Sequence, residues 1–90
     1  SYQTNFSFEL EEYNQPIFIL LEVFDIRGKK VFNYQNEYEF SPNFIDDISW
    51  DGKDLNYNPL PQGIYIYKLH VNNLVNGKKV TVHNKVFKKL

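Results

Sequence analysis

The stretch of sequence that decides the fold is WDGKDLNYNPLPQGIYIYKL, residues 50–69. It contains the end of one expected strand, a long polar loop and the beginning of another strand. Gly52, after Asp51, can take the positive φ that a tight turn needs, and Pro61 fixes φ for a second turn. The next strand begins at Gly63. This stretch therefore predicts an architecture before it indicates a function.

The side chains after the polar loop alternate between two faces. One face carries Tyr65, Tyr67, Leu69 and Val71, and the other carries Ile64, Ile66, Lys68 and His70. Because successive side chains of a strand point to opposite faces, this period of two predicts a strand with one face against a core.

The composition of the 90-residue chain favours one all-β domain. A chain of this length buries only roughly 60 to 68% of its unfolded surface, so its core needs large side chains. Eight Phe, seven Tyr and one Trp supply them. Ala and Met, two of the best helix formers, are absent, whereas Val, Ile and aromatic residues, which favour strands, are abundant. The absence of Cys excludes disulfides, thiol catalysis and thiolate zinc sites.

The charge and hydropathy patterns argue against two classes of partner. A net charge of −1 without a basic stripe predicts no nucleic-acid partner. No apolar run reaches the ~18 residues of a membrane-spanning segment, and no signal peptide is recognisable. Because the sequence has no initiating Met, we expect residues 1–90 to be a single domain excised from a larger protein.

Turn signals divide the chain into short segments with the patterns of strands. The expected strands cover residues 5–10, 17–24, 31–40, 44–50, 63–72 and 79–90, and 31–40 could divide around Gln35-Asn36 into two. The nearly continuous apolar run of 17–24 predicts a strand buried on both faces. Short, evenly spaced strands predict an immunoglobulin-like antiparallel β-sandwich of about seven strands.

Two glycines mark hairpins between the expected strands. Gly28 within residues 25–30 predicts a short loop that contains a left-handed residue. The pair Asn76-Gly77 is the strongest short hairpin signal in the chain.

Five oxygen-bearing side chains within eleven residues suggest a calcium site: Asp46, Asp47, Asp51, Asp54 and Asn56. Their spacing does not match an EF-hand loop, which needs oxygen ligands at alternate positions, a glycine and a late glutamate. We favour the interpretation that Asp51 and Asp54 accept backbone N–H groups within their own turns. We therefore expect no metal ion and no cofactor.

The other candidate sites each have a structural interpretation beside a functional one. His70 and His83 could hold a metal across a hairpin, but their strands carry no carboxylate, and both are expected to point outwards. Trp50 with Tyr65 and Tyr67 could form a platform for sugars, but we favour core positions with polar tips bonded at the rim. The four serines fall in no nucleophile motif, so we predict no catalytic residue and no enzyme.

The last part of the chain concentrates positive charge on Lys78, Lys79, Lys85, Lys88 and Lys89. Lysines on an outer strand discourage edge-to-edge pairing, and the same lysines could form a recognition tail. Charge reversal at Lys85 and Lys88 is expected to leave the domain folded, because both side chains are predicted to be exposed.

Four segments in this order resemble a known family: VFDIRGKKV at 23–31, WDGKD at 50–54, LPQGIYIYKL at 60–69 and NKVFKKL at 84–90. They resemble the immunoglobulin-like domain of flagellar hook-cap proteins and, more closely, the C-terminal domains of proteins exported by the type IX (Por) secretion system. The residues that carry the structural motif are Asp25, Gly28, Trp50, Asp51, Gly52, Asp54, Pro61, Gly63, Tyr65 and Tyr67.

This resemblance implies a sorting signal without catalysis of its own. Such a domain folds in the periplasm, is recognised by outer-membrane components of the secretion machinery, a translocon or shuttle barrel protein, and reaches the surface of a Gram-negative bacterium. We place recognition on the last strand, because an edge strand can pair with a partner's backbone, at Lys85, Val86, Phe87, Lys88, Lys89 and Leu90. The full WDGKD loop and the long hairpin 72–79 are most similar to the version that the surface sortase retains.

The chain departs from the family pattern at residues 57–59, Tyr-Asn-Pro, where many relatives have a glycine in the loop. We expect Asn58 to take the left-handed conformation there. Two other interpretations stay open on the sequence: an extracellular immunoglobulin-like module for adhesion or glycan contact, and a flagellar hook-cap domain.

Overall fold

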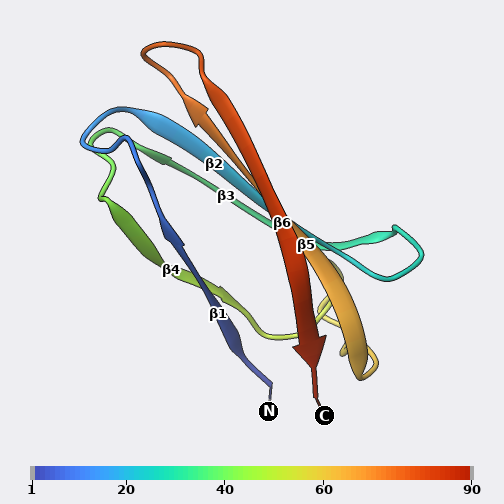
Figure 1. Ribbon diagram of the computed structural model, residues 1–90. Helices are drawn as coiled ribbons and strands as arrows, with labels where there is room; N and C mark the ends of the chain where they lie inside the picture. Colours follow the sequence, from blue (N-terminus) through green and yellow to red (C-terminus); the bar gives the residue numbers. More distant parts are fainter. Residues whose placement is uncertain (1, 90) are drawn as a thin grey trace.

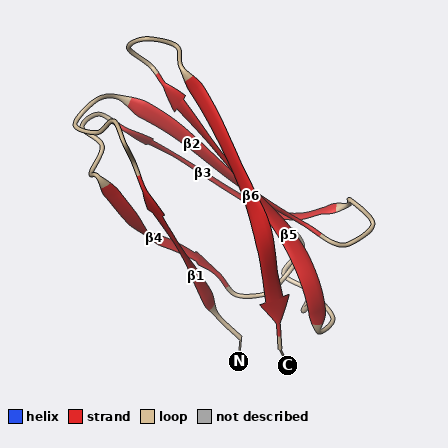
Figure 2. Cartoon of the chain, in the orientation of Figure 1, coloured by secondary structure: helices blue, strands red, loops and turns tan. Residues whose placement is uncertain are grey.

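The computed structural model describes residues 2–89, which form an all-β sandwich (Figure 1). The strands are β1 (Thr4–Glu9), β2 (Ile17–Phe24), β3 (Lys30–Tyr38), β4 (Phe44–Trp50), β5 (Gly63–Asn73) and β6 (Lys79–Lys88). One sheet pairs β1 with β4, and the other has the order β3-β2-β5-β6, with antiparallel neighbours throughout. Within the described residues there is no helix (Figure 2), and so none that could cross a membrane.

The predicted immunoglobulin-like sandwich is confirmed, but with six strands in residues 2–89 rather than about seven. The sequence could divide 31–40 near Gln35, whereas the structure keeps β3 continuous. Its residues pair with β2 through this region without interruption, with Leu20 opposite Gln35 and Ile19 opposite Asn36. The only register shift in this pair lies close to the hairpin, between Val23 and Phe24.

The expectation that residues 17–24 are buried on both faces is wrong. In β2 the side chains Ile17, Ile19, Leu21 and Val23 are buried, and the alternate side chains Phe18, Leu20, Glu22 and Phe24 are only partly buried. A two-layer sandwich covers one face of each sheet, so even its central strand keeps a second face towards solvent. The apolar residues on that second face leave an outer surface of β2 that is partly hydrophobic.

The core lies between the two sheets and is dominated by large side chains. Its buried members are Phe6, Ile17, Ile19, Leu21, Val23, Val31, Ile45, Ile48, Trp50, Tyr65 and Leu69. The alternation predicted for residues 64–71 is confirmed, because the inward row of β5 packs on this core and the outward row does not. Both strands of the narrow sheet make aromatic contacts across the two layers, β1 through Phe6 and Phe8 and β4 through Trp50.

Trp50, at the end of β4, makes two of these contacts and is 1% exposed. Its ring centroid lies 5.5 Å from that of Tyr65 on β5 and 6.0 Å from that of Phe32 on β3. Phe6 on β1 approaches Tyr67 on β5 at 4.9 Å in an edge-to-face arrangement. Such pairs contribute about 0.5–1.5 kcal/mol beyond the area they bury, so they fix the relative position of the two sheets.

Both predicted hairpin glycines have a positive φ, 87° at Gly28 and 74° at Gly77. In the β2–β3 turn, Oδ1 of Asp25 accepts the backbone N–H groups of Arg27 and Lys29, each at 2.9 Å. The backbone N–H of Lys29 has the largest effect on the pKa of Asp25 and lowers it, whereas desolvation opposes this shift. The turn is therefore closed by Asp25 and has Gly28 in the left-handed conformation.

We predict that Trp50→Ala lowers the free energy of unfolding by about 3 to 5 kcal/mol, as truncation of a large buried side chain does. Phe40→Ala is the matched control, because Phe40 is 71% exposed and its loss should cost no more than about 0.5 kcal/mol. Chemical denaturation of both variants measures the difference. A loss below about 1 kcal/mol for Trp50→Ala would show that the two sheets do not depend on this side chain.

Candidate functional site

The polar loop after β4 is built from two turns that its own carboxylates close. Oδ1 of Asp51 accepts the N–H of Lys53 at 3.1 Å, and Oδ1 of Asp54 accepts the N–H groups of Asn56 and Asn58 at 2.8 and 2.9 Å. These backbone donors, Asn58 first, lower the pKa of Asp54. The interpretation of Asp51 and Asp54 as turn-closing residues is confirmed.

The other two acidic residues of the suggested calcium cluster lie on β4 instead of in the loop. Asp47 accepts a hydrogen bond from the hydroxyl of Tyr38 at 3.2 Å, and the side chain of Asp46 is exposed. Across residues 2–89, no three His, Cys, Asp or Glu side chains come together in a group that could hold a metal ion. The described role of Asp51 and Asp54 in the loop is to stabilise its turns.

The non-glycine residue of this loop that takes the left-handed conformation is Tyr57, with φ of 65°, and not Asn58 as expected. The reason is Pro59, because a residue that precedes proline is restricted to extended conformations. The left-handed position therefore moves one residue towards the N-terminus, where a tyrosine must accept it. The N–H of Tyr57 bonds to the carbonyl of Asp54 at 3.0 Å, which holds the turn in place.

The polar tips of two core aromatics attach this loop to the sandwich. Nε1 of Trp50 donates to the carbonyl of Lys53 at 3.0 Å, and the hydroxyl of Tyr65 donates to the carbonyl of Pro61 at 2.7 Å. Both side chains are buried. The predicted core positions of Trp50 and Tyr65, with tips bonded at the rim, are confirmed, and an exposed sugar platform on Trp50 is not formed.

The end of β6 is anchored to this loop by Lys88. The side chain of Lys88 lies across Gly52 and the ring of Tyr2, with Nζ 5.2 Å from the ring centroid, and the residue is only 4% exposed. Gly52 has φ of 78°, and a Cβ there would collide with the Lys88 stem and the Tyr2 ring. The expectation that Lys88 is exposed is wrong, because its aliphatic stem fills the slot that Gly52 leaves open.

The residues assigned to recognition on β6 divide between its two faces. Val86 is partly buried against the core, on the same face as Lys88, whereas Lys85 and Phe87 point to the outer face. Lys89 is exposed beyond the end of β6, and Leu90 lies outside the described residues. The five described residues of this set therefore do not form one continuous surface.

Neighbouring strands add apolar side chains to this outer face. Phe87 lies opposite Ile64, Lys85 lies opposite Ile66, and Ile66 in turn lies opposite Phe24 on β2. Phe87 is 51% exposed, Ile64 is also exposed, and Ile66 and Phe24 are partly buried. We call these five residues the outer patch: Phe24, Ile64, Ile66, Lys85 and Phe87.

Strand β6 is also an edge strand of the four-stranded sheet within the described chain. Its far edge therefore has free backbone donors and acceptors, and exposed lysines accompany it, among them Lys79 and Lys85. Lysines at such positions reduce edge-to-edge pairing. The position of β6 at the sheet edge agrees with the interpretation that these lysines discourage edge-to-edge pairing. The same exposed lysines are accessible to a partner.

The two histidines lie on neighbouring strands of the outer face, as expected. Nε2 of His70 donates to Glu22 at 2.7 Å, because an ionised carboxylate only accepts, and Nδ1 lies 3.1 Å from the Thr81 hydroxyl. Partial burial opposes ionisation of Glu22, but hydrogen bonds from Lys30 and His70 outweigh it and lower its pKa. His83 lies opposite Lys68 rather than beside His70.

Sequence reasoning missed two residues of this region, Tyr2 and Phe24. Tyr2 contacts both Trp50, with centroids 5.9 Å apart, and Lys88. Phe24 joins the outer patch through strand register. Neither has a local signal, because each acquires its role from a strand that is distant in the sequence.

Comparison of the chain with protein-family models, curated proteins and solved structures finds no match in any of the three.

We predict that Gly52→Ala destabilises the domain more than Gly28→Ala does. Both glycines have a positive φ, which costs an alanine about 1–2 kcal/mol, but a Cβ at Gly28 meets no atom within 4 Å. Only Gly52→Ala must also displace Lys88 and Tyr2. Chemical denaturation of both variants, and of Gly52→Ala combined with Lys88→Ala, measures this coupling.

Removal of the Lys88 stem should recover part of the extra loss in the double variant. If Gly52→Ala and Gly28→Ala lower the free energy of unfolding equally, and Lys88→Ala recovers none of the loss, β6 is not anchored through the space above Gly52.

Proposed function

We propose that this chain is a non-catalytic targeting and docking domain for type IX secretion across the outer membrane, of the kind that the surface sortase retains. It would fold in the periplasm and present β6 to an outer-membrane translocon or shuttle barrel protein on the way to the cell surface. The resemblance of the four sequence segments described above supports this proposal. The observation that supports a docking role is the outer patch at the end of an edge strand.

The outer patch has the composition of a protein contact surface. Apolar side chains of β5 and β6, Ile64 and Phe87 among them, are left half exposed, with the cationic Lys85 beside them. Aromatic anchors near the centre of a contact contribute most of its binding energy, and charges at the rim mainly increase association rate and selectivity. Phe87 and Lys85 fit these two roles.

The anchoring of Lys88 makes this patch a fixed surface instead of a loose chain end. With the Lys88 stem in its slot and Val86 against the core, the intervening Phe87 is held outwards. A partner that binds a preformed surface does not lose affinity to the ordering of a flexible segment. One face of the strand therefore carries stability, and the other is available for recognition.

The free backbone edge of β6 adds a second means of contact. An extended segment of a partner can pair with such an edge, so that main-chain hydrogen bonds give affinity while side chains select the partner. This suits a machinery that must recognise many cargoes, because backbone pairing does not depend on the cargo's sequence. The lysines would steer the approach to an acidic surface, with an effect that weakens at high salt.

Export of a reporter fused to this domain tests the proposal in a bacterium that has the type IX machinery. We predict that Lys85→Glu combined with Phe87→Thr blocks surface delivery of the reporter. The control is Lys79→Glu combined with Leu74→Thr, which makes the same charge change and replaces an apolar residue of similar exposure away from the patch. The control fusion should be exported normally.

Thermal unfolding of the purified domains should show that both double variants remain folded, since exposed substitutions change stability by only about half a kcal/mol. Normal delivery of the folded Lys85→Glu/Phe87→Thr fusion would remove the outer patch from the sorting signal and leave an adhesion module as the better interpretation. Equal blockage of both double variants would show that export responds to β6 charge in general and not to the patch.

A further inference from the structure

The two sheets of the sandwich differ in width, and the part of the inner face of β6 that carries Val80 and Val82 is left uncovered. Two strands, β1 and β4, face a sheet of four (Figure 1). The inward side chains Leu21 of β2 and Leu69 of β5 are fully buried, whereas Val80 and Val82 of β6 are 47% and 44% exposed. Both valines share the inner face, because Val82 pairs with Leu69. A strand beside β1 would cover them.

A groove with a volume of about 460 Å³ lies along this uncovered face, between β1 and β6. This volume falls within the range of about 300–1,000 Å³ that is typical of binding sites. Its apolar lining consists of Phe8, Leu10, Ile17, Leu69, Val71, Val80 and Val82. The groove is thus an extension of the hydrophobic core that reaches solvent.

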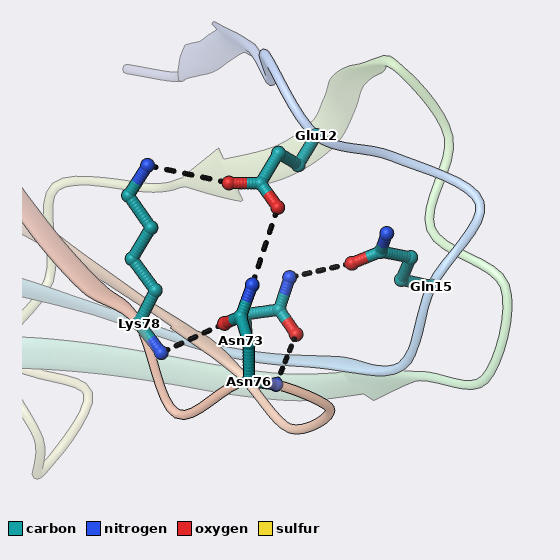
Figure 3. Close-up of polar contacts among 5 residues, drawn as sticks. All are labelled: Glu12, Gln15, Asn73, Asn76 and Lys78. Atoms are coloured by element: carbon teal, nitrogen blue, oxygen red, sulfur yellow. Dashed lines mark hydrogen bonds and ion pairs between the residues drawn. The ribbon is translucent and has the colours of Figure 1, made fainter.

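One end of the groove is closed by a polar network between the β5–β6 turn and the β1–β2 connection (Figure 3). The carboxylate of Glu12 accepts hydrogen bonds from Nζ of Lys78 and Nδ2 of Asn76, each at 3.3 Å. Nδ2 of Asn73 donates to Oε1 of Gln15 at 2.6 Å. These contacts link the β5–β6 turn to the β1–β2 connection and pair Lys78, a cation that lines the groove, with Glu12.

The wall of the groove that β1 forms has a free backbone edge. In the part of the chain that the structure describes, β1 pairs with β4 alone. Along this wall Phe8 and Leu10 point inward and Ser7 and Glu9 point outward. Glu9 and Glu11 line the groove and, among residues 2–89, neither forms an ion pair.

We propose that this groove binds an extended segment of a partner protein as an additional strand beside β1, with apolar and cationic side chains at alternate positions. The apolar side chains would cover Val80 and Val82, and the lysine or arginine side chains would lie beside Glu9 and Glu11. Opposite charges on neighbouring strands stabilise the pair, and the free N–H and C=O groups of β1 supply the backbone bonds.

A single added strand would match the apolar lining, the two carboxylates and the free backbone edge of β1. Because its side chains alternate between two faces, apolar side chains can cover the valines while cationic ones lie beside the carboxylates. Its backbone can form hydrogen bonds with the free edge of β1. The groove opens on the inner face of β6, whereas the outer patch lies on its opposite face. This binding activity is therefore independent of the sorting function proposed above.

The test uses blocked, fluorescein-labelled nonapeptides with the purified 90-residue chain, which buries its own core. The first peptide alternates lysine and valine, and the second has glutamate in place of every lysine. Fluorescence anisotropy at low ionic strength should give an affinity at least about tenfold higher for the lysine peptide, because the carboxylates select its charge. Equal affinities would overturn the proposal.

Two N-methylated lysine–valine peptides test the backbone pairing. One carries N-methyl groups on its valines and the other on its lysines, so each lacks the donors of one strand edge. Because an added strand pairs with β1 through one edge only, one methylated peptide should lose binding and the other should keep it. Retention of binding by both would contradict strand addition.

Variants of the chain locate the site. Val82→Glu should abolish binding of the lysine peptide, whereas Val75→Glu, an equivalent change at an exposed position of the β5–β6 turn, should leave it unchanged. Glu9→Lys combined with Glu11→Lys should reverse the preference in favour of the glutamate peptide. An unchanged preference would overturn the proposal. Light scattering gives a second test: if the chain forms dimers and the lysine peptide does not dissociate them, the proposal is also overturned.

Discussion

The packing of Trp50 between the two sheets is the contact on which the rest of the structure depends. The narrow sheet has only two strands, so few side chains are available to hold it against the wide sheet. Trp50 reaches Phe32 on β3 and Tyr65 on β5, and its indole N–H fixes the loop that leads from one sheet to the other. In a domain of this size, with no disulfide, such aromatic contacts take the place of a larger core.

The same corner of the molecule determines the two faces of β6. Gly52 follows Trp50 by two residues, and the slot above this glycine accepts Lys88. One end of β6 is therefore anchored, and its outward side chains are held in a defined position. At the other end, the narrow sheet does not extend far enough to cover Val80 and Val82. The slot at Gly52 thus anchors one section of β6, and the unequal widths of the sheets leave another section uncovered.

The local patterns of the sequence predict much of this fold, because strand period and turn chemistry depend on neighbouring residues. The alternation after Gly63, the left-handed Gly28 and the carboxylate-closed turns at Asp51 and Asp54 are all of this kind. The left-handed residue is Tyr57 and not the expected Asn58. The sequence contains the information for this correction, because Pro59 restricts Asn58 to extended conformations.

The remaining features depend on which strands meet, and no local pattern contains that information. An apolar run such as 17–24 does not reveal whether one layer or two will cover the sheet. A lysine in an alternating strand, such as Lys88, gives no sign that a glycine and a tyrosine far away in the sequence will enclose its stem. The groove beside β1 follows from the number of strands in the facing sheet, and the outer patch from register across three strands.

The central claim is that β6 is anchored at its Lys88 end through the Trp50 corner and uncovered at its Val80 end. Native-state hydrogen exchange, followed residue by residue by NMR, measures this directly, because each amide reports the free energy of the opening that exposes it. The hydrogen-bonded amides of residues 85–88 should exchange only through openings close to global unfolding, and those of 79–82 through openings of lower free energy. Uniform protection along β6, or the opposite gradient, would contradict the account.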